Sequence, residues 1–170
     1  MSRTYRGSKA PGWEHWGNLR ERQEQAADCK ISEWKDSMTI DKSKWRITEN
    51  EYLMGRAVHY PLTATEKQNM EKLLIAVNLL RDLYNKPMKV SSGYRPGVYN
   101  KAADGANRSC HLTCEAIDLQ DTDRLLTAWL LTNLDILEDA GLYMEDNKST
   151  PTWVHLQIRA PRSGKRIFIP

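Results

Sequence analysis

The chain has 170 residues, a length that fits one domain with a full hydrophobic core and excludes a second domain of that kind. Hydrophobic residues make up 40% and charged residues 28% of the sequence, which excludes a disordered or low-complexity protein. The net charge is only +3, and residues 1–46, with ten Lys and Arg against seven Asp and Glu, carry all of the excess.

Residues 1–46 are predicted to form a polar, Trp-rich extension rather than an independent domain. They hold four of the six tryptophans, but the charged stretches between them offer few apolar contacts. We expect these tryptophans to anchor the extension on the following domain or on a partner. The basic start suits an anionic polymer or is a solubilising tail. Nucleic acid binding is not expected, because no recognisable nucleic-acid module follows.

The sequence contains no segment typical of membrane insertion. Residues 1–20 are polar, and the longest apolar run, at 73–80, is broken by Asn78. We therefore expect no signal peptide, no membrane span, and synthesis in a cytoplasm. The three cysteines cannot all pair with one another, so reduced thiols are expected.

Helical periodicity predicts two core helices after the extension. The first has Thr65 as its N-cap, ends at residues 85–87, and has an apolar face of Met70, Leu73, Leu74, Val77, Leu80 and Leu83. The second follows a cap at Asp121 or Thr122 and ends at Gly141. Its apolar stripe consists of Leu125, Leu126, Trp129, Leu130, Leu134 and Leu137.

Short strands are predicted around these helices. One strand at 88–91 precedes a turn-rich loop at 92–97, and another strand lies at 116–119. Strands at 142–145 and 153–159 are predicted to form a hairpin, with a last edge strand at 166–169. This order indicates an α+β domain over residues 47–170, with a small, mostly antiparallel sheet backed by two or three helices.

Two of the four histidines lie on or near these strands. Alternation turns His155, with Trp153 and Gln157, away from the apolar face, and we expect it to look into open space. Alternation also puts Asp118 on that face, so the two side chains converge if their strands are neighbours. His111 precedes Asp118 by seven residues and can fold back over the same face. Two imidazoles and one carboxylate, with a fourth position left to water, are typical of a catalytic zinc site.

Four segments occur in a specific order along the chain. They are Ser-Ser-Gly-Tyr-Arg at 91–95, Tyr-Asn-Lys-Ala-Ala at 99–103 with Gly-Ala at 105–106, Ser-Cys-His-Leu-Thr-Cys-Glu-Ala-Ile-Asp at 109–118, and Trp-Val-His at 153–155. Together they resemble the VanY-type zinc D-alanyl-D-alanine peptidase family, which includes cell-wall carboxypeptidases and phage endolysins and has a Hedgehog-like peptidase fold. The resemblance covers about residues 47–170.

The resemblance implies roles for individual residues. It makes His111, Asp118 and His155 the zinc ligands, and it makes Arg95 and Ser109 the groups that hold the substrate's carbonyl or carboxylate. A guanidinium is the natural partner of a peptide carboxylate. Zinc would supply a water-derived nucleophile and polarise the scissile carbonyl, and a carboxylate base would carry the proton to the leaving amine.

The chain departs from the family at the base. Many members have Glu or Asp three residues before the final His, where this sequence has Thr152. Glu145 and Asp146, at the end of the preceding strand, are the candidate replacements, and the alternative is that both are solvated turn carboxylates. A second departure replaces a family glycine with Cys114, which alters the pocket or is simply tolerated.

Other side chains near these motifs have two interpretations each. Cys110 and Cys114 bracket His111 and suggest a thiolate metal site, although idle thiols are the favoured alternative. Tyr94 and Trp153 line a substrate groove or pack beside the site.

The leading hypothesis is a zinc-dependent peptidase that cleaves peptidoglycan stem peptides, as a D,D-carboxypeptidase or an L,D-endopeptidase. It would act as a phage endolysin or a virion-associated lysin, which reaches the wall through a holin or inside the particle and so needs no signal peptide. The alternative is a catalytically impaired peptidase fold that serves as a structural component of a phage particle, with residues 1–46 binding other virion proteins. The related Hedgehog signalling domain is a binding protein, so fold alone does not decide.

Overall fold

The computed structural model describes residues 42–170, apart from the side chain of Lys44. The chain divides into one unit of residues 1–40 and a second of residues 41–170. Most of the expected extension, including Trp13, Trp16 and Trp34, lies outside the described residues. Trp45, which we counted with the extension, is only 8% exposed and belongs to the core of the second unit. No helix in the described part of the chain is long and apolar enough to cross a bilayer.

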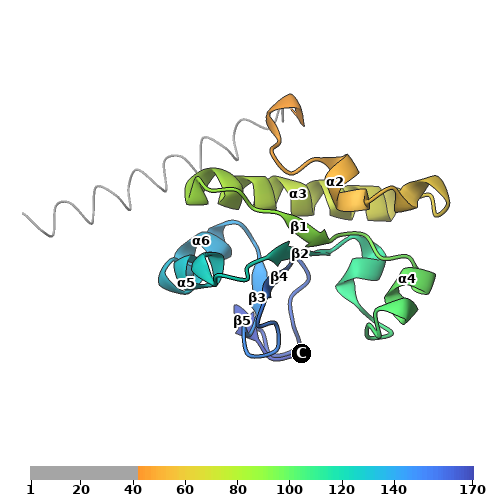
Figure 1. The fold of residues 1–170 in the computed structure, drawn as a ribbon. Helices are drawn as coiled ribbons and strands as arrows, with labels where there is room; N and C mark the ends of the chain where they lie inside the picture. The colour runs from red at the N-terminus through yellow and green to blue at the C-terminus, as the bar shows by residue number, and fades with distance from the viewer. Residues whose placement is uncertain (1–41) are drawn as a thin grey trace, which may run out of the picture. The chain divides into compact units, whose positions relative to one another are not determined.

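The described residues form an α+β domain around a five-stranded sheet, as the sequence predicts (Figure 1). The strands are β1 (Val90–Ser92), β2 (Ala116–Gln120), β3 (Tyr143–Glu145), β4 (Trp153–Gln157) and β5 (Ile167–Phe168), in the spatial order β1-β2-β4-β3-β5. Every neighbouring pair is antiparallel except β3 and β5, which are parallel. The predicted hairpin and edge strand are therefore confirmed, with somewhat shorter bounds.

The helices surround this sheet. They are α2 (Glu49–Leu53), α3 (Ala64–Tyr84), α4 (Gly97–Ala102), α5 (Leu125–Thr132) and α6 (Leu134–Asp139), with short 3-10 turns η1 (Lys42–Lys44), η2 (Arg56–Val58) and η3 (Cys110–Thr113). In Figure 1, α3 runs along the sheet, with α5 and α6 toward one end and α4 toward the other. Helix α4 was not predicted, because a short segment that begins with Pro96-Gly97 has the composition of a turn.

Helix α3 begins two residues earlier than expected. Thr63, rather than Thr65, is the N-cap, because its hydroxyl accepts from Glu66 N while the Glu66 carboxylate accepts from Thr63 N. The helix ends at Asn85, which has the left-handed φ of 54°. The buried face includes the predicted Met70, Leu73, Leu74, Val77 and Leu80.

The single helix predicted between Asp121 and Gly141 is wrong, since the structure has two. The break lies at Asn133, whose backbone is not helical and whose amide donates to Trp129 O at 2.7 Å. Leu125 and Leu134, two members of the predicted stripe, are 51% and 40% exposed. The Asp121 carboxylate does bind the first turn of α5, accepting from the backbone N–H of residues 126 and 127.

Candidate metal centre

The core of the site is a register pair between two neighbouring strands. Strand β2 pairs with β4 so that Asp118 lies directly opposite His155, and Asp118 Oδ1 is 2.7 Å from His155 Nδ1. Side chains of directly opposed residues share one face of a sheet. The sequence predicts that Asp118 and His155 converge if their strands are neighbours, and β2 and β4 are neighbours.

His155 does not look into open space, and that expectation is wrong. Its residue is 9% exposed, because the ring is covered by His111, with ring centroids 5.1 Å apart, and by Phe168, at 6.4 Å. Phe168 comes from β5, which reaches this face beyond β3. Alternation gave the correct face of β4, but a single strand does not reveal which other segments cover that face.

The third side chain, His111, comes from η3. Ser109 caps this turn with its hydroxyl, which accepts from His111 N, and Arg95 N donates to His111 O at 3.1 Å. The ring nitrogen His111 Nδ1 lies 2.8 Å from Gly93 O, and Nε2 lies 3.2 Å from Asp118 Oδ1. A carbonyl oxygen only accepts, so Nδ1 carries a proton, and Nε2 is the nitrogen that faces Asp118.

Gly93 is required for this arrangement. A Cβ atom there would lie 1.9 Å from Tyr52 O, which belongs to the backbone of α2. The Tyr52 carbonyl accepts from Tyr94 N, and this bond fixes the loop beside it. The close approach of the two backbones holds the Gly93 carbonyl where it meets the His111 ring.

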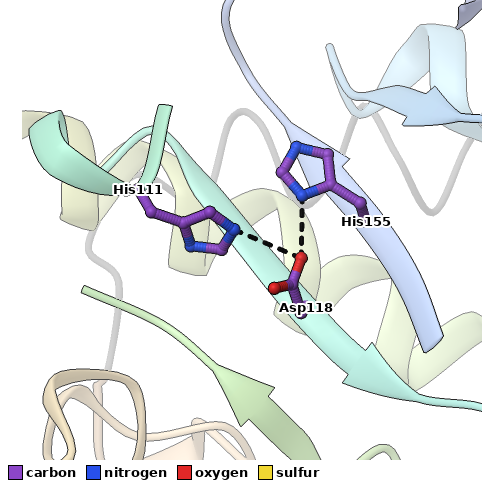
Figure 2. Close-up of side chains that lie close together, drawn as sticks. All are labelled: His111, Asp118 and His155. Carbon is purple, nitrogen blue, oxygen red and sulfur yellow. Dashed lines mark hydrogen bonds and ion pairs between the residues drawn. The ribbon is translucent and has the colours of Figure 1, made fainter. Parts of the chain in front are cut away.

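Figure 2 shows the three side chains converging from η3, β2 and β4. His111, Asp118 and His155 are all buried, and each offers one ligand atom within 4.8 Å of the others. Two imidazole nitrogens and one carboxylate oxygen form a donor set that fits a zinc ion with an open position. The Gly93 carbonyl behind His111 is the kind of partner that orients metal-binding histidines.

The charges of this cluster depend on one another. Burial opposes ionisation of Asp118, but the hydrogen bonds with His111 and His155 outweigh it and hold the pKa of Asp118 well below its usual value. Burial lowers the pKa of His111 despite the neighbouring Asp118. Burial also disfavours the charged form of His155, yet the hydrogen bond and charge of Asp118 raise the pKa of His155. The Asp118 carboxylate at the centre of the cluster is therefore ionised.

Arg95 lies at the edge of this cluster. Its Nη2 is 3.9 Å from Asp118 Oδ2, and burial lowers the pKa of its guanidinium even though Asp118 opposes the change. The buried Arg95 Nε has no hydrogen-bond partner among the described residues. An unsatisfied buried donor beside the cluster leaves one N–H group available to a ligand.

The other predicted substrate-binding residues lie at different depths. Tyr94 is 5% exposed and its side chain packs in the core, which favours the packing alternative. Trp153 is half-buried at the start of β4, on the face that carries His155. The Ser109 hydroxyl is occupied as the cap of η3.

The structure separates the two candidate bases. Residues 143 and 144 of β3 pair with residues 157 and 156 of β4, and continuing this register by one residue puts Glu145 opposite His155. Glu145 is half-buried, and burial raises the pKa of its carboxyl although the charge of His155 opposes the change. The Asp146 carboxylate instead accepts from Lys148 N at 2.8 Å, within the turn after β3.

Neither thiol belongs to the ligand group. Cys110 and Cys114 are 8% and 0% exposed, and the group that the described residues assemble contains only His111, Asp118 and His155. Burial raises the pKa of Cys114 to about 12. Cys114 also has a left-handed φ of 58°, a conformation that favours glycine, which explains why a glycine suits this position.

Sequence reasoning gave no role to two residues that touch the cluster. Phe168 covers His155, and no local pattern in the sequence points to that contact. Gln157 lies within hydrogen-bond distance of His155, and strand alternation alone places it on the same face.

Comparison with known proteins adds one finding. A family model described as Peptidase M15 matches residues 48–156, a segment that runs from the cap of α2 into β4 and contains all three potential ligands. No curated protein gave a significant match to this sequence.

Proposed function

The chain belongs to the peptidase M15 family of zinc metallopeptidases, and from this premise we propose that it is a zinc-dependent peptidase acting on peptidoglycan stem peptides. The observation that carries the proposal is the buried group of His111, Asp118 and His155, whose three ligand atoms lie within 4.8 Å of one another. Zinc bound there supplies Lewis-acid chemistry to a peptide carbonyl and to water.

Arg95 and Glu145 have the remaining roles in the proposed reaction. Arg95, with its unpartnered Nε, binds the scissile carbonyl oxygen or a terminal carboxylate of the peptide and holds it beside the cluster. Glu145, opposite His155, takes a proton from the attacking water and returns it to the leaving amine. The peptide C–N bond breaks, a C–O bond to the water oxygen forms, and the products are a carboxylate and an amine.

The raised pKa of Glu145 suits this role. A half-buried carboxyl that holds a proton more tightly than usual is a better base once it is ionised. Thr152, at the position of the base in many relatives, is exposed and has no basic group. Glu145 therefore replaces it from the neighbouring strand.

We place this activity in a phage enzyme, either an endolysin or a virion-associated lysin. The protein would be made in the host cytoplasm and act at the cell wall or in the particle, with residues 1–40 available to bind other virion proteins. Thr152 favours one second candidate, a structural component of a phage particle that keeps the fold and the metal but has lost catalysis.

One experiment tests the activity and separates the two candidates. The zinc-loaded full chain is incubated with purified peptidoglycan, and new amino groups and the masses of released fragments are measured, with Asp118→Ala as the control. We expect new amino groups with the wild type only, and the fragment masses identify a D,D- or an L,D-bond. Bound zinc without any new amino group would contradict the enzyme proposal and favour the structural role.

A further inference from the structure

Gln157 is a buried polar residue directly behind the metal centre. It ends β4, two residues after His155 on the same face, and is 6% exposed. It lies between two other strands, opposite Ala116 of β2 and Tyr143 of β3. A buried amide in the middle of a sheet needs partners for both its oxygen and its nitrogen.

The two ends of the Gln157 amide have different partners, and these partners fix its orientation. Nε2 donates to the backbone carbonyl of Arg159, and Oε1 lies 3.3 Å from His155 Nε2. The oxygen and nitrogen of a glutamine amide have nearly the same shape and can be exchanged, but the Arg159 carbonyl only accepts hydrogen bonds. The nitrogen must therefore face Arg159, and the oxygen must face His155.

Arg159 is itself held in place by the segment that carries His111. Its guanidinium contacts the Glu115 carboxylate and the hydroxyl of Thr113, and Ile158 N donates to Glu115 O at 3.0 Å. The carbonyl that orients Gln157 is thus anchored to residues just after η3. These contacts keep the Gln157 amide in one orientation.

This orientation favours one of the two nitrogens of His155 as the carrier of the proton. Gln157 Oε1 only accepts, so it stabilises a proton on Nε2, and a zinc ion at Nδ1, in place of the hydrogen bond to Asp118, would leave Nε2 as the nitrogen that carries the proton. At His111 the two nitrogens are exchanged, since the Gly93 carbonyl accepts from Nδ1 and Nε2 faces Asp118. On each imidazole, the ring nitrogen that does not face Asp118 thus lies within hydrogen-bond distance of a protein oxygen.

We propose that Gln157 is a positioning residue that holds His155 in the tautomer whose Nδ1 binds zinc. The inference rests on the proposed zinc function of the same site. Partners of this kind behind a histidine ligand change metal affinity by about 10- to 100-fold when they are removed. Gln157 touches neither the ion nor the substrate.

Three variants of the full chain test this role. Gln157→Met removes both hydrogen bonds at similar volume, Gln157→Glu keeps an accepting oxygen behind His155, and Gln68→Met on the exposed side of α3 is the matched control. Zinc affinity is measured by competition with a chromophoric chelator. We expect a loss of about 10- to 100-fold for Gln157→Met, a smaller loss for Gln157→Glu, which keeps the acceptor but loses the donor to the Arg159 carbonyl, and wild-type affinity for Gln68→Met.

A second readout observes the tautomer itself. In zinc-loaded protein labelled with ¹⁵N-histidine, long-range ¹H–¹⁵N spectra should show the His155 proton on Nε2. A proton on Nδ1 in the wild type, or unchanged zinc affinity in Gln157→Met, would overturn the inference alone. If Gln157→Met does not fold, the Gln157→Glu affinity and the wild-type spectrum decide. A wild type that binds no zinc would overturn the proposed function and this inference together.

Discussion

Asp118 and His155 are register partners on adjacent antiparallel strands, and this pairing brings Asp118 Oδ1 to 2.7 Å from His155 Nδ1. Glu145 follows Met144, the last β3 residue paired with β4, and extending that register by one residue puts Glu145 in the same row. Two potential zinc ligands and the proposed base thus come from three neighbouring strands. Strand pairing fixes the position of each of these residues. We therefore expect the substitution of one of them to leave the other two in place.

Replacement of Glu145 should remove the catalytic base. Glu145→Gln is expected to lower kcat/KM on peptidoglycan peptides by about 10²- to 10⁴-fold, the usual contribution of general base catalysis. Asp146→Asn is the matched control and should stay close to wild type, because the Asp146 carboxylate serves the turn. Steady-state kinetics of the two zinc-loaded variants measure the difference. Equal activity in both variants would contradict the assignment.

The same variant has a predicted pH signature in the metal-free protein. Burial raises the pKa of Glu145 above 4.5, so the folded state binds this proton more tightly than the unfolded state. The group therefore contributes least to stability at neutral pH, where it must be ionised in a half-buried position. With a chelator present, the melting temperature of Glu145→Gln relative to that of the wild type should increase as the pH rises from about 4 to 7. A difference that is constant or reversed over this range would argue against the burial effect.

Asn78 should matter for stability and not for zinc. Its side chain accepts from the backbone N–H groups of Arg46 and Ile47 and donates to the carbonyls of Ile47 and Leu74, so it fastens the start of the domain to α3. Asn78→Leu leaves the buried backbone N–H and C=O of Ile47 unpaired and should cost about 3 kcal/mol of unfolding free energy. Denaturant unfolding and zinc titration of the same variant check both statements. A stable variant, or one with altered zinc affinity, would count against them.

The two described cysteines should be unreactive in the folded protein. Burial raises the pKa of both thiols, to about 12 for Cys114, so little thiolate forms near neutral pH. In a Cys29→Ala background, we expect a thiol reagent at pH 8 to label neither residue until denaturant is added, and then both. Rapid labelling of the native protein, or protection that depends on zinc, would revive the thiolate metal site.

The sequence predicted that Asp118 and His155 share one face, because this placement follows from local rules. Alternation with a period of two assigned Asp118 and His155 to one face without knowledge of the neighbours. The choice between Glu145 and Asp146 needed the register of β3 against β4, which no local pattern contains. The burial of His155 likewise depends on Phe168, which joins the sheet from the far end of the chain.

The errors in the helices have a similar origin. Asn133 is compatible with one apolar stripe from Leu125 to Leu137, but its side chain bonds back to the preceding turn and ends α5. Thr63 and Thr65 are both acceptable caps, with Glu66 and Gln68 at their third following positions, and the structure forms the capping box at Thr63. Local competition between good alternatives limited the prediction at these points.

The most direct test of the account is anomalous scattering at the zinc edge from crystals of the zinc-loaded protein. We predict one peak at about 2.0–2.2 Å from His111 Nε2, Asp118 Oδ1 and His155 Nδ1. No peak among these three atoms, or a zinc ion bound by other residues, would contradict the assignment of this cluster as the metal centre.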